Sequence, residues 1–358
     1  MNLARRLAEA ALTPLVPADV LDLVSPLRAG AELRGRIEAI EPETADAATI
    51  VIRPGKDWAG HVPGQYVRIG IDVDGDRQRR AYSLTHGPRA DGRISVTVKA
   101  VPDGKVSSYL VHRARTGTLV HLEQAAGEFV LPDDERGKLL FVTAGSGITP
   151  VIGMLRNLHP STEEGVLNPA RSDHYDIVVV HVAPSEPDSI FIADLKSLHK
   201  AGAISLVARY DDVDGVLDVA DLTHLVPDLT ERTTFACGPS GLLDALERHH
   251  ADRGLELMTE QFRTAYIAAG EGGTVSFHRT GTTLEADGGT PILDAAEAAG
   301  VLMPSGCRMG ICYGCVLPLR EGVVRDLRTG ELTSAVSGDN VKIQTCINAA
   351  AGACDIDH

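Results

Sequence analysis

The chain has 358 residues, 44% of them hydrophobic, which is enough for two or three globular domains with sizeable cores. Its formal net charge of −15 argues against a nucleic-acid partner, because such a partner binds a basic face. No apolar run is long enough to span a membrane, and the first residues lack the apolar core of a signal peptide. We therefore expect a cytoplasmic protein that is peripheral to a membrane only through a partner.

Residues 1–32 predict an N-terminal helical arm. Leu3, Leu7 and Ala11 recur at helical spacing, and Pro14 then interrupts the pattern. Such an arm packs on the next domain, which is the interpretation we favour, or it docks on a membrane-bound partner.

Residues 33–135 change to an alternation of apolar and polar residues with a period of two. Glycine and proline clusters separate several short runs of this kind, which is typical of an antiparallel β-barrel. The predicted strands are Leu33–Glu41, Thr49–Arg53, Tyr66–Val73, Arg79–Leu84, Arg93–Ala100 and Leu119–Glu123.

Residues 136–265 predict a parallel α/β domain, because short apolar strands alternate with helical runs. A glycine-containing stretch, residues 264–272, predicts a linker to the last segment, 272–358. The predicted strands are Leu139–Thr143, Asp176–Val182, Ile204–Ala208 and Thr233–Ala236, and the predicted helices are Val151–Asn157, Ile190–Leu198, Ser240–Ala251 and Pro291–Ala299.

Four of the six cysteines, Cys307, Cys312, Cys315 and Cys346, follow the spacing C-x4-C-x2-C and then a distant C. Plant-type ferredoxins bind a [2Fe–2S] cluster through this spacing, so the C-terminal segment resembles a β-grasp ferredoxin. A structural zinc site is the alternative, although zinc ribbons pair two C-x2-C knuckles and only one occurs here. The other two cysteines lie far apart, which does not indicate a secreted disulfide framework.

Arg80, Tyr82, Ser83 and Leu84 belong to an R-x-Y-S-L run on a predicted barrel strand. An arginine can clamp a pyrophosphate with a bidentate fork, an aromatic ring can stack on a flavin, and a hydroxyl can bond the flavin edge. The alternative is an ordinary exposed strand, because such a strand can contain R-x-Y-S without binding a ligand.

Gly104, Lys105, Val106 and Ser107 form a G-K-x-S run at a predicted helix start. Free backbone N–H groups at a helix N-terminus favour an anion such as a pyrophosphate. A plain serine-capped helix start is the alternative.

Gly145, Gly147 and Thr149 belong to a G-S-G-I-T-P turn between an apolar strand and a helix. Dinucleotide phosphates bind at such turns, although a tight turn can also exist without a ligand.

Cys237, Gly238 and Pro239 follow the last predicted strand of the parallel sheet, and Glu260 comes later in the chain. Ligands bind at the carboxyl ends of parallel strands, so this thiol is a candidate for the site. A small buried thiol before a turn is the alternative.

These motifs, in this order and followed by a ferredoxin, resemble the ferredoxin-reductase family of flavoproteins with a fused C-terminal [2Fe–2S] domain. The resemblance covers all of the chain except the N-terminal arm. It implies that the first two motifs hold FAD and that Thr149, Cys237 and Glu260 lie where a nicotinamide meets the flavin ring. The overall layout is most similar to the electron-transfer partners of bacterial stearoyl-CoA desaturases.

The sequence favours NADPH over NADH only slightly. Arg209, at the end of a predicted strand, and Ser185, after the preceding strand, match positions that meet the 2′-phosphate in NADPH-using relatives. If Arg209 is merely a surface arginine, NADH is the expected nucleotide.

The resemblance implies a reductase that passes electrons from NADPH through FAD and the cluster to a terminal oxygenase or a membrane-bound desaturase. FAD takes electron pairs and releases single electrons, so it must act between nicotinamide and cluster. The alternatives are an electron-carrier module that is active only within a complex, an NADH-dependent reductase of a Rieske oxygenase or P450, and a reductase that releases free reduced flavin.

Overall fold

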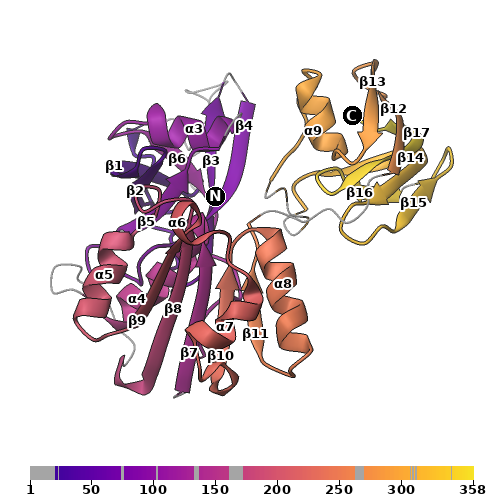
Figure 1. Ribbon diagram of the computed structural model, residues 1–358. Helices are drawn as coiled ribbons and strands as arrows, with labels where there is room; N and C mark the ends of the chain where they lie inside the picture. The colour runs from indigo at the N-terminus through magenta and orange to yellow at the C-terminus, as the bar shows by residue number, and fades with distance from the viewer. Residues whose placement is uncertain are drawn as a thin grey trace. The chain divides into compact units, whose positions relative to one another are not determined.

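The computed structural model describes residues 21–22, 24–73, 76–101, 104–132, 137–160, 172–262, 270–306, 308, 310, 313–339 and 341–358. Three β-sheets follow one another along the described chain (Figure 1). The first two belong to one compact unit, except for residues 72–73 and 76–80 of the first sheet. Most of the arm expected over residues 1–32 lies outside the described residues. No helix in the described ranges has the length and apolar character needed to cross a membrane.

The first sheet is antiparallel and has the strand order β4-β3-β6-β1-β2-β5. A bridge between Leu84 and Val96 connects the two ends of this order, so the sheet closes on itself as the alternating sequence predicts. Helix α3 (Lys105–His112) connects β5 to β6. The strands are β1 (Arg34–Thr44), β2 (Ala47–Pro54), β3 (Tyr66–Val73), β4 (Asp76–Ser83), β5 (Ile94–Lys99) and β6 (Leu119–Leu122).

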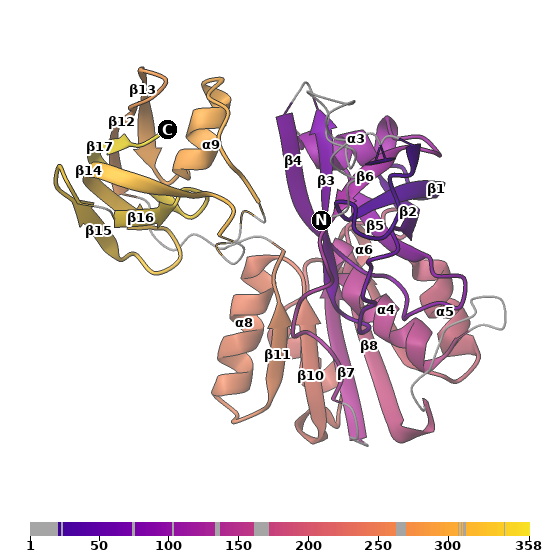
Figure 2. The ribbon, with the colours of Figure 1, turned by 180° about the vertical axis from the view of Figure 1, so that it is seen from behind.

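The second sheet is parallel and has the order β11-β10-β7-β8-β9. Its inner strands are almost continuously apolar, because helices cover both faces of such a sheet. Figures 1 and 2 show α8 beside β11 at one edge. The elements are β7 (Gly137–Ala144), α4 (Ile148–Leu158), β8 (Tyr175–Ala183), α5 (Ile192–Lys200), β9 (Ser205–Tyr210), α6 (Asp211–Asp214), α7 (Leu222–Leu225), β10 (Arg232–Cys237), α8 (Ser240–Ala251) and β11 (Leu257–Glu260).

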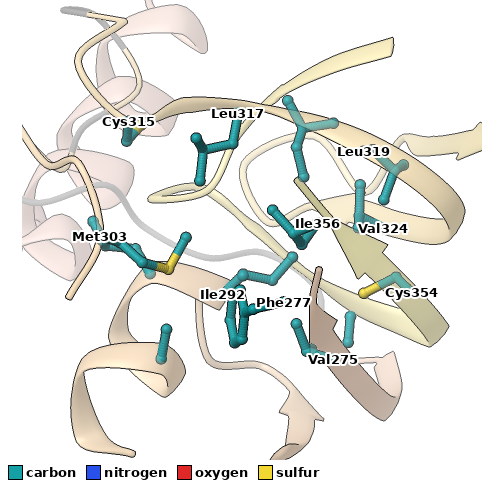
Figure 3. Close-up of a cluster of buried hydrophobic side chains, with 14 of the residues drawn as sticks. Val275, Phe277, Ile292, Met303, Cys315, Leu317, Leu319, Val324, Cys354 and Ile356 are labelled. Carbon is teal, nitrogen blue, oxygen red and sulfur yellow. The ribbon is translucent and has the colours of Figure 1, made fainter. Parts of the chain in front are cut away.

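The third sheet has the order β13-β12-β17-β14-β15, with β16 also paired to β14. Its buried apolar cluster draws only on residues between Val275 and Ile356, and Figure 3 shows these side chains converging beneath the sheet. The elements are β12 (Gly270–Phe277), β13 (Thr282–Gly288), α9 (Ile292–Ala298), β14 (Val316–Asp326), β15 (Leu332–Ala335), β16 (Val341–Gln344) and β17 (Asn348–Ile356). The predicted fold class, with a barrel, a parallel α/β sheet and a ferredoxin domain, is confirmed.

The linker expected over residues 264–272 is wrong at its end, because Gly270 already begins strand β12. The glycines there serve close strand packing. Gly272 has a φ of +77°, and a Cβ on it would lie 2.3 Å from the Ala286 carbonyl oxygen. The part of the expected linker from 264 to 269 lies outside the described residues.

Arg232 ties together the amino ends of the central parallel strands. Its side chain is 5% exposed and pairs with Asp228 and Asp176. It also donates to the backbone carbonyl oxygens of Leu139 and Asp176, at 3.1 and 3.0 Å. The Arg232 guanidinium, together with Lys138, lowers the pKa of Asp228 to about 2. A buried cation with this many bonds cannot be removed without leaving acceptors unsatisfied.

We expect Arg232→Met to lower the free energy of unfolding by about 1–3 kcal/mol, because it leaves the carbonyl oxygens of Leu139 and Asp176 without the buried cation that donates to them. The measurement is the denaturant midpoint followed by far-ultraviolet circular dichroism. The matched control is Arg248→Met, which removes an exposed arginine from α8 and should change stability by less than about 0.5 kcal/mol. Equal effects of the two substitutions would contradict the role given to Arg232.

Candidate functional site

The carboxyl ends of three parallel strands bring Cys237, Glu260 and Thr143 into one row. Cys237 on β10 is in register with Glu260 on β11 and with Thr143 on β7. Residues at the same register of parallel strands point to the same face of the sheet. Cys237 and Glu260, both candidates from the sequence, are 23 positions apart in the chain but lie side by side in the sheet. They lie at the carboxyl edge, where such folds bind ligands.

The glycine-rich turn lies directly against the end of β10. A Cβ on Gly147 would lie 2.0 Å from the Cys237 carbonyl oxygen, so only glycine fits there. Gly145 has a φ of +53°, in the left-handed region, and a Cβ on it would meet no atom within 4 Å. The turn can thus follow β7 closely and leave open space beside its first glycine. Gly238 is also part of this contact, since its backbone nitrogen is 2.9 Å from the same Cβ position.

Burial keeps the Cys237–Glu260 pair uncharged. Burial raises the pKa of Glu260 to about 8, and its Oε2 atom is shielded without a hydrogen-bond partner among the described residues. Burial, and next the Glu260 carboxylate, raises the pKa of the Cys237 thiol well above its ordinary value. At neutral pH the pair therefore offers a thiol and a carboxylic acid. Shielded groups of this kind fit a site that is completed by a bound ligand.

Thr149 lies in the first turn of helix α4 as a buried residue whose hydroxyl donates to the Ser146 carbonyl oxygen at 2.9 Å. The sequence did not single out a second pair, Thr143 and His181, whose side chains are joined at 2.8 Å. Both are fully buried, and burial lowers the pKa of His181 to about 4. This neutral pair extends the row of polar groups from Cys237 to β8. No local motif marks it.

Strand β4 carries the R-x-Y-S motif. Alternation along the strand puts Arg80 and Tyr82 on one face and Ser83 on the other. Ser83 is 3% exposed, and its hydroxyl has no hydrogen-bond partner among the described residues. Because an unsatisfied buried hydroxyl is costly, it fits a site for a polar ligand edge such as that of a flavin. Leu84 follows the strand and forms the bridge that closes the barrel.

The second motif sits at the start of helix α3, as predicted. Gly104 is the residue before the helix, and no side chain caps the helix N-terminus. The Ser107 hydroxyl accepts from the Val101 backbone nitrogen at 3.3 Å and donates to the Gly104 carbonyl oxygen at 3.4 Å. A Cβ on Gly104 would lie 2.5 Å from this hydroxyl. Lys105 and Val106 open the helix, with Val106 buried, so uncapped N–H groups there fit a pyrophosphate.

Arg209 lies at the carboxyl end of β9, in register with Val182 on β8. Its guanidinium donates to the Asp214 carbonyl oxygen at 3.0 Å, while its Nε atom has no partner in the described structure. The Ser185 hydroxyl, just beyond β8, donates to Asp188 at 2.6 Å. Arg209 and Ser185, the two candidates for binding a 2′-phosphate, therefore lie at the ends of adjacent strands, beside acidic residues.

Two of the four candidate iron ligands are described and are close together. The Sγ atoms of Cys315 and Cys346 are 3.1 Å apart, which is too long for a disulfide, and both residues are buried. Thr345 fixes this pair by donating through both its backbone nitrogen and its hydroxyl to the Cys315 carbonyl oxygen. Two converging buried thiols fit a metal cluster. Cys307 and Cys312 lie outside the described residues.

Arg308 anchors the cysteine loop to helix α9, a contact that sequence reasoning missed. It donates to Asp294 and Glu297, which are three residues apart on one face of the helix. Arg308 itself has a left-handed φ of 59°. Two carboxylates at helical spacing before a loop arginine were the available signal.

Two family models match the chain. Residues 38–131 match an oxidoreductase FAD-binding domain, and residues 276–350 match a 2Fe-2S iron-sulfur cluster binding domain. These matches fall on the barrel and on the third sheet, where the candidate flavin and iron ligands lie.

The chain is 43% identical to a protein of Mycobacterium tuberculosis H37Rv named NADPH oxidoreductase, over 99% of this chain and 91% of that protein. It is 26% identical to the glycine betaine monooxygenase reductase subunit of Pseudomonas aeruginosa, covering 83% and 87% of the two chains. In fold it is similar to phthalate dioxygenase reductase, with a TM-score of 0.60, 21% identity, and 91% and 97% coverage. The chain belongs to the family of ferredoxin-reductase-type, NAD(P)H-dependent flavoprotein oxidoreductases that carry FAD and a C-terminal [2Fe–2S] ferredoxin domain.

Proposed function

We propose that the protein is an NADPH-dependent reductase that delivers electrons to a terminal oxygenase. The observation that carries this proposal is the contact of Gly147 with the Cys237 carbonyl, with Glu260 in register beside it. This contact brings the glycine-rich turn against the Cys237-Gly238-Pro239 motif. A protein without a nucleotide site would not need these two motifs to be in contact. We assign FAD binding to residues 33–135, nucleotide binding to 136–265 and cluster binding to the segment from Gly270 to His358.

The bound cofactors supply the redox chemistry, because FAD accepts a hydride and releases single electrons, which the cluster takes one at a time. The protein's own part is binding and orientation. Arg80, Tyr82, Ser83 and the start of α3 would hold FAD, with the unsatisfied Ser83 hydroxyl as a bonding group for the ring. The α3 N-terminus and Lys105 would meet the pyrophosphate.

Thr149, Cys237 and Glu260 would shape the nicotinamide end of the site. The Cys237 thiol and the Glu260 carboxylic acid are uncharged at neutral pH. They can therefore orient the nicotinamide ring and exclude water without binding a counter-ion. The open space beside Gly145 lets backbone approach the nucleotide phosphates. No side chain needs to act as a nucleophile.

The proposed acceptor is a terminal oxygenase. Relatives are named as reductase subunits of a glycine betaine monooxygenase and of a 3-ketosteroid-9-alpha-monooxygenase. A membrane-bound desaturase is the second candidate, proposed from the layout of the chain. In both cases we place the protein in the cytoplasm, with any membrane contact made through the acceptor.

The nucleotide choice is tested by anaerobic titration with NADPH and, separately, NADH, followed by the visible spectrum. We expect bleaching of flavin and cluster bands at lower NADPH than NADH. Arg209→Ala should raise the KM for NADPH about 10- to 100-fold, the loss expected for a charged hydrogen bond, and leave NADH unchanged. The role of Arg209 is refuted if the wild type prefers NADH, or if the variant raises the KM for NADPH and for NADH equally.

The cluster ligands are tested by paired cysteine substitutions in the same domain. Cys346→Ala should abolish the broad iron–sulfur absorbance and retain the flavin band, because a cluster needs all its ligands. The control, Cys354→Ala, removes another buried cysteine of the domain and should retain both bands. Retention of the cluster by the Cys346 variant would remove that residue from the ligand set.

Glu260 gives a test of the site through stability. Its pKa is raised from 4.5 to about 8 in the folded protein, so between these values the folded state holds a proton that the unfolded state releases. The ionisable carboxyl therefore lowers stability increasingly as the pH rises, and Glu260→Gln removes this effect. We expect the denaturant midpoint of the variant to rise relative to wild type between about pH 5 and pH 8. The control, Glu247→Gln, replaces an exposed glutamate of α8. If the difference in midpoint between Glu260→Gln and wild type does not change with pH, the raised pKa of Glu260 is contradicted.

A further inference from the structure

Helix α4 packs against the segment that directly follows the flavin motif. A Cβ on Gly153 would lie 2.4 Å from the Leu84 carbonyl oxygen. A Cβ on Gly87 would lie 2.4 Å from the Asn157 side-chain oxygen. Gly153 and Asn157 are four residues apart and share one helix face. This face of α4 therefore touches the chain immediately beyond Ser83, and the first turn of the same helix carries Thr149.

Arg156 lies on this face and bonds to the same segment. One of its terminal nitrogens, Nη1, donates to the Thr85 carbonyl oxygen at 3.1 Å and lies 3.1 Å from Nε2 of His86. Because a guanidinium only donates, His86 must accept through Nε2 and remain neutral. Burial, and next the Arg156 charge, lowers the pKa of His86 to about 3. The cation is thus held by the barrel segment through two acceptors.

The other terminal nitrogen of Arg156 reaches helix α5. It donates to the carboxylate of Asp194, in the first turn of that helix. The guanidinium also lies over the ring of Phe191, 4.7 Å from the centroid, and Phe191 has a left-handed φ of 61°. The side chain of Arg156 is only 15% exposed. One partly buried cation therefore connects the segment after β4, helix α4 and the start of α5.

We propose that Arg156 is a positioning residue that sets the distance between the flavin held by β4 and the nicotinamide held by the turn before α4. The inference rests on the proposed function and names a residue that touches neither cofactor. The glycines allow the close approach of the two segments, and the guanidinium fixes their register through polar bonds. A small error of placement is enough to slow hydride transfer strongly, because the reacting atoms must be within van der Waals reach.

The test is stopped-flow reduction of the holoprotein by saturating NADPH without oxygen, followed at the flavin band and at long-wavelength charge-transfer absorbance. Arg156→Ala should lower the limiting rate about 10- to 100-fold and weaken the charge-transfer band, with FAD content and cluster spectrum retained. The KM for NADPH should change less than the limiting rate, because the nucleotide contacts remain. Arg156→Lys, which keeps the charge without the fork, should recover part of the rate.

The matched control is Arg89→Ala, which removes an arginine of the same barrel segment that pairs with Asp91. Its limiting rate should equal that of the wild type. If Arg156→Ala loses FAD or fails to fold, Arg156→Lys and Asp194→Asn decide, since each removes only part of the network and both should be slower than wild type. Wild-type rates in the Ala variant, or in both partial variants, would overturn the proposal. A wild-type protein that neither nucleotide reduces would instead refute the proposed function.

Discussion

The contact between the backbone of Gly147 and the carbonyl of Cys237 is the constraint on which the proposed nucleotide site depends. A side chain at position 147 would overlap the end of β10, so the turn after β7 could not lie where it does. With the turn in place, helix α4 begins at Ile148 and carries Thr149 in its first turn, and Cys237 and Glu260 lie side by side at the ends of β10 and β11. The absence of one Cβ therefore decides whether distant parts of the sequence share a site.

The amino and carboxyl ends of the parallel sheet differ in whether their buried polar side chains are charged. At the amino ends, Arg232 is neutralised by carboxylates and carbonyl oxygens, and its bonds join three strands. At the carboxyl ends, Cys237 and His181 are buried and Glu260 is partly buried, and all three are uncharged at neutral pH. The amino ends thus hold a cation whose charge is satisfied, whereas the polar groups at the carboxyl ends carry no charge of their own.

Sequence reasoning was most successful where the chemistry is local. Some patterns predict structure from a few neighbouring residues: glycines at fixed spacing, cysteines at ligand spacing and strands with alternating residues. The fold class, the FAD domain and the cluster domain were recognised from these patterns. Strand ends were less accurate, because pairing partners decide them: β4 extends from Asp76 although only Arg79–Leu84 was predicted.

Arg156 and Arg308 could not be predicted in the same way. Arg156 gains its importance from Thr85 and Asp194 on other elements, and nothing near it in the sequence marks those partners. For Arg308, the signal was the helical spacing of Asp294 and Glu297, which was overlooked. The glycines of β12 were misjudged for a related reason. Glycine permits both a flexible linker and a close strand crossing, and only the neighbouring strand distinguishes the two.

The strand order of the ferredoxin sheet makes it sensitive to where the chain is cut. Strand β17 is the last element in sequence, yet it lies between β12 and β14 in the sheet. A nonsense mutation just before Asn348 would remove the middle strand of the sheet and separate the β12–β13 pair from the strands β14, β15 and β16. Cys346 would still be present in such a fragment, but the strands that frame its loop would have lost their common neighbour. The residues of β17 thus hold the sheet around the proposed ligand Cys346, although none of them is a proposed ligand.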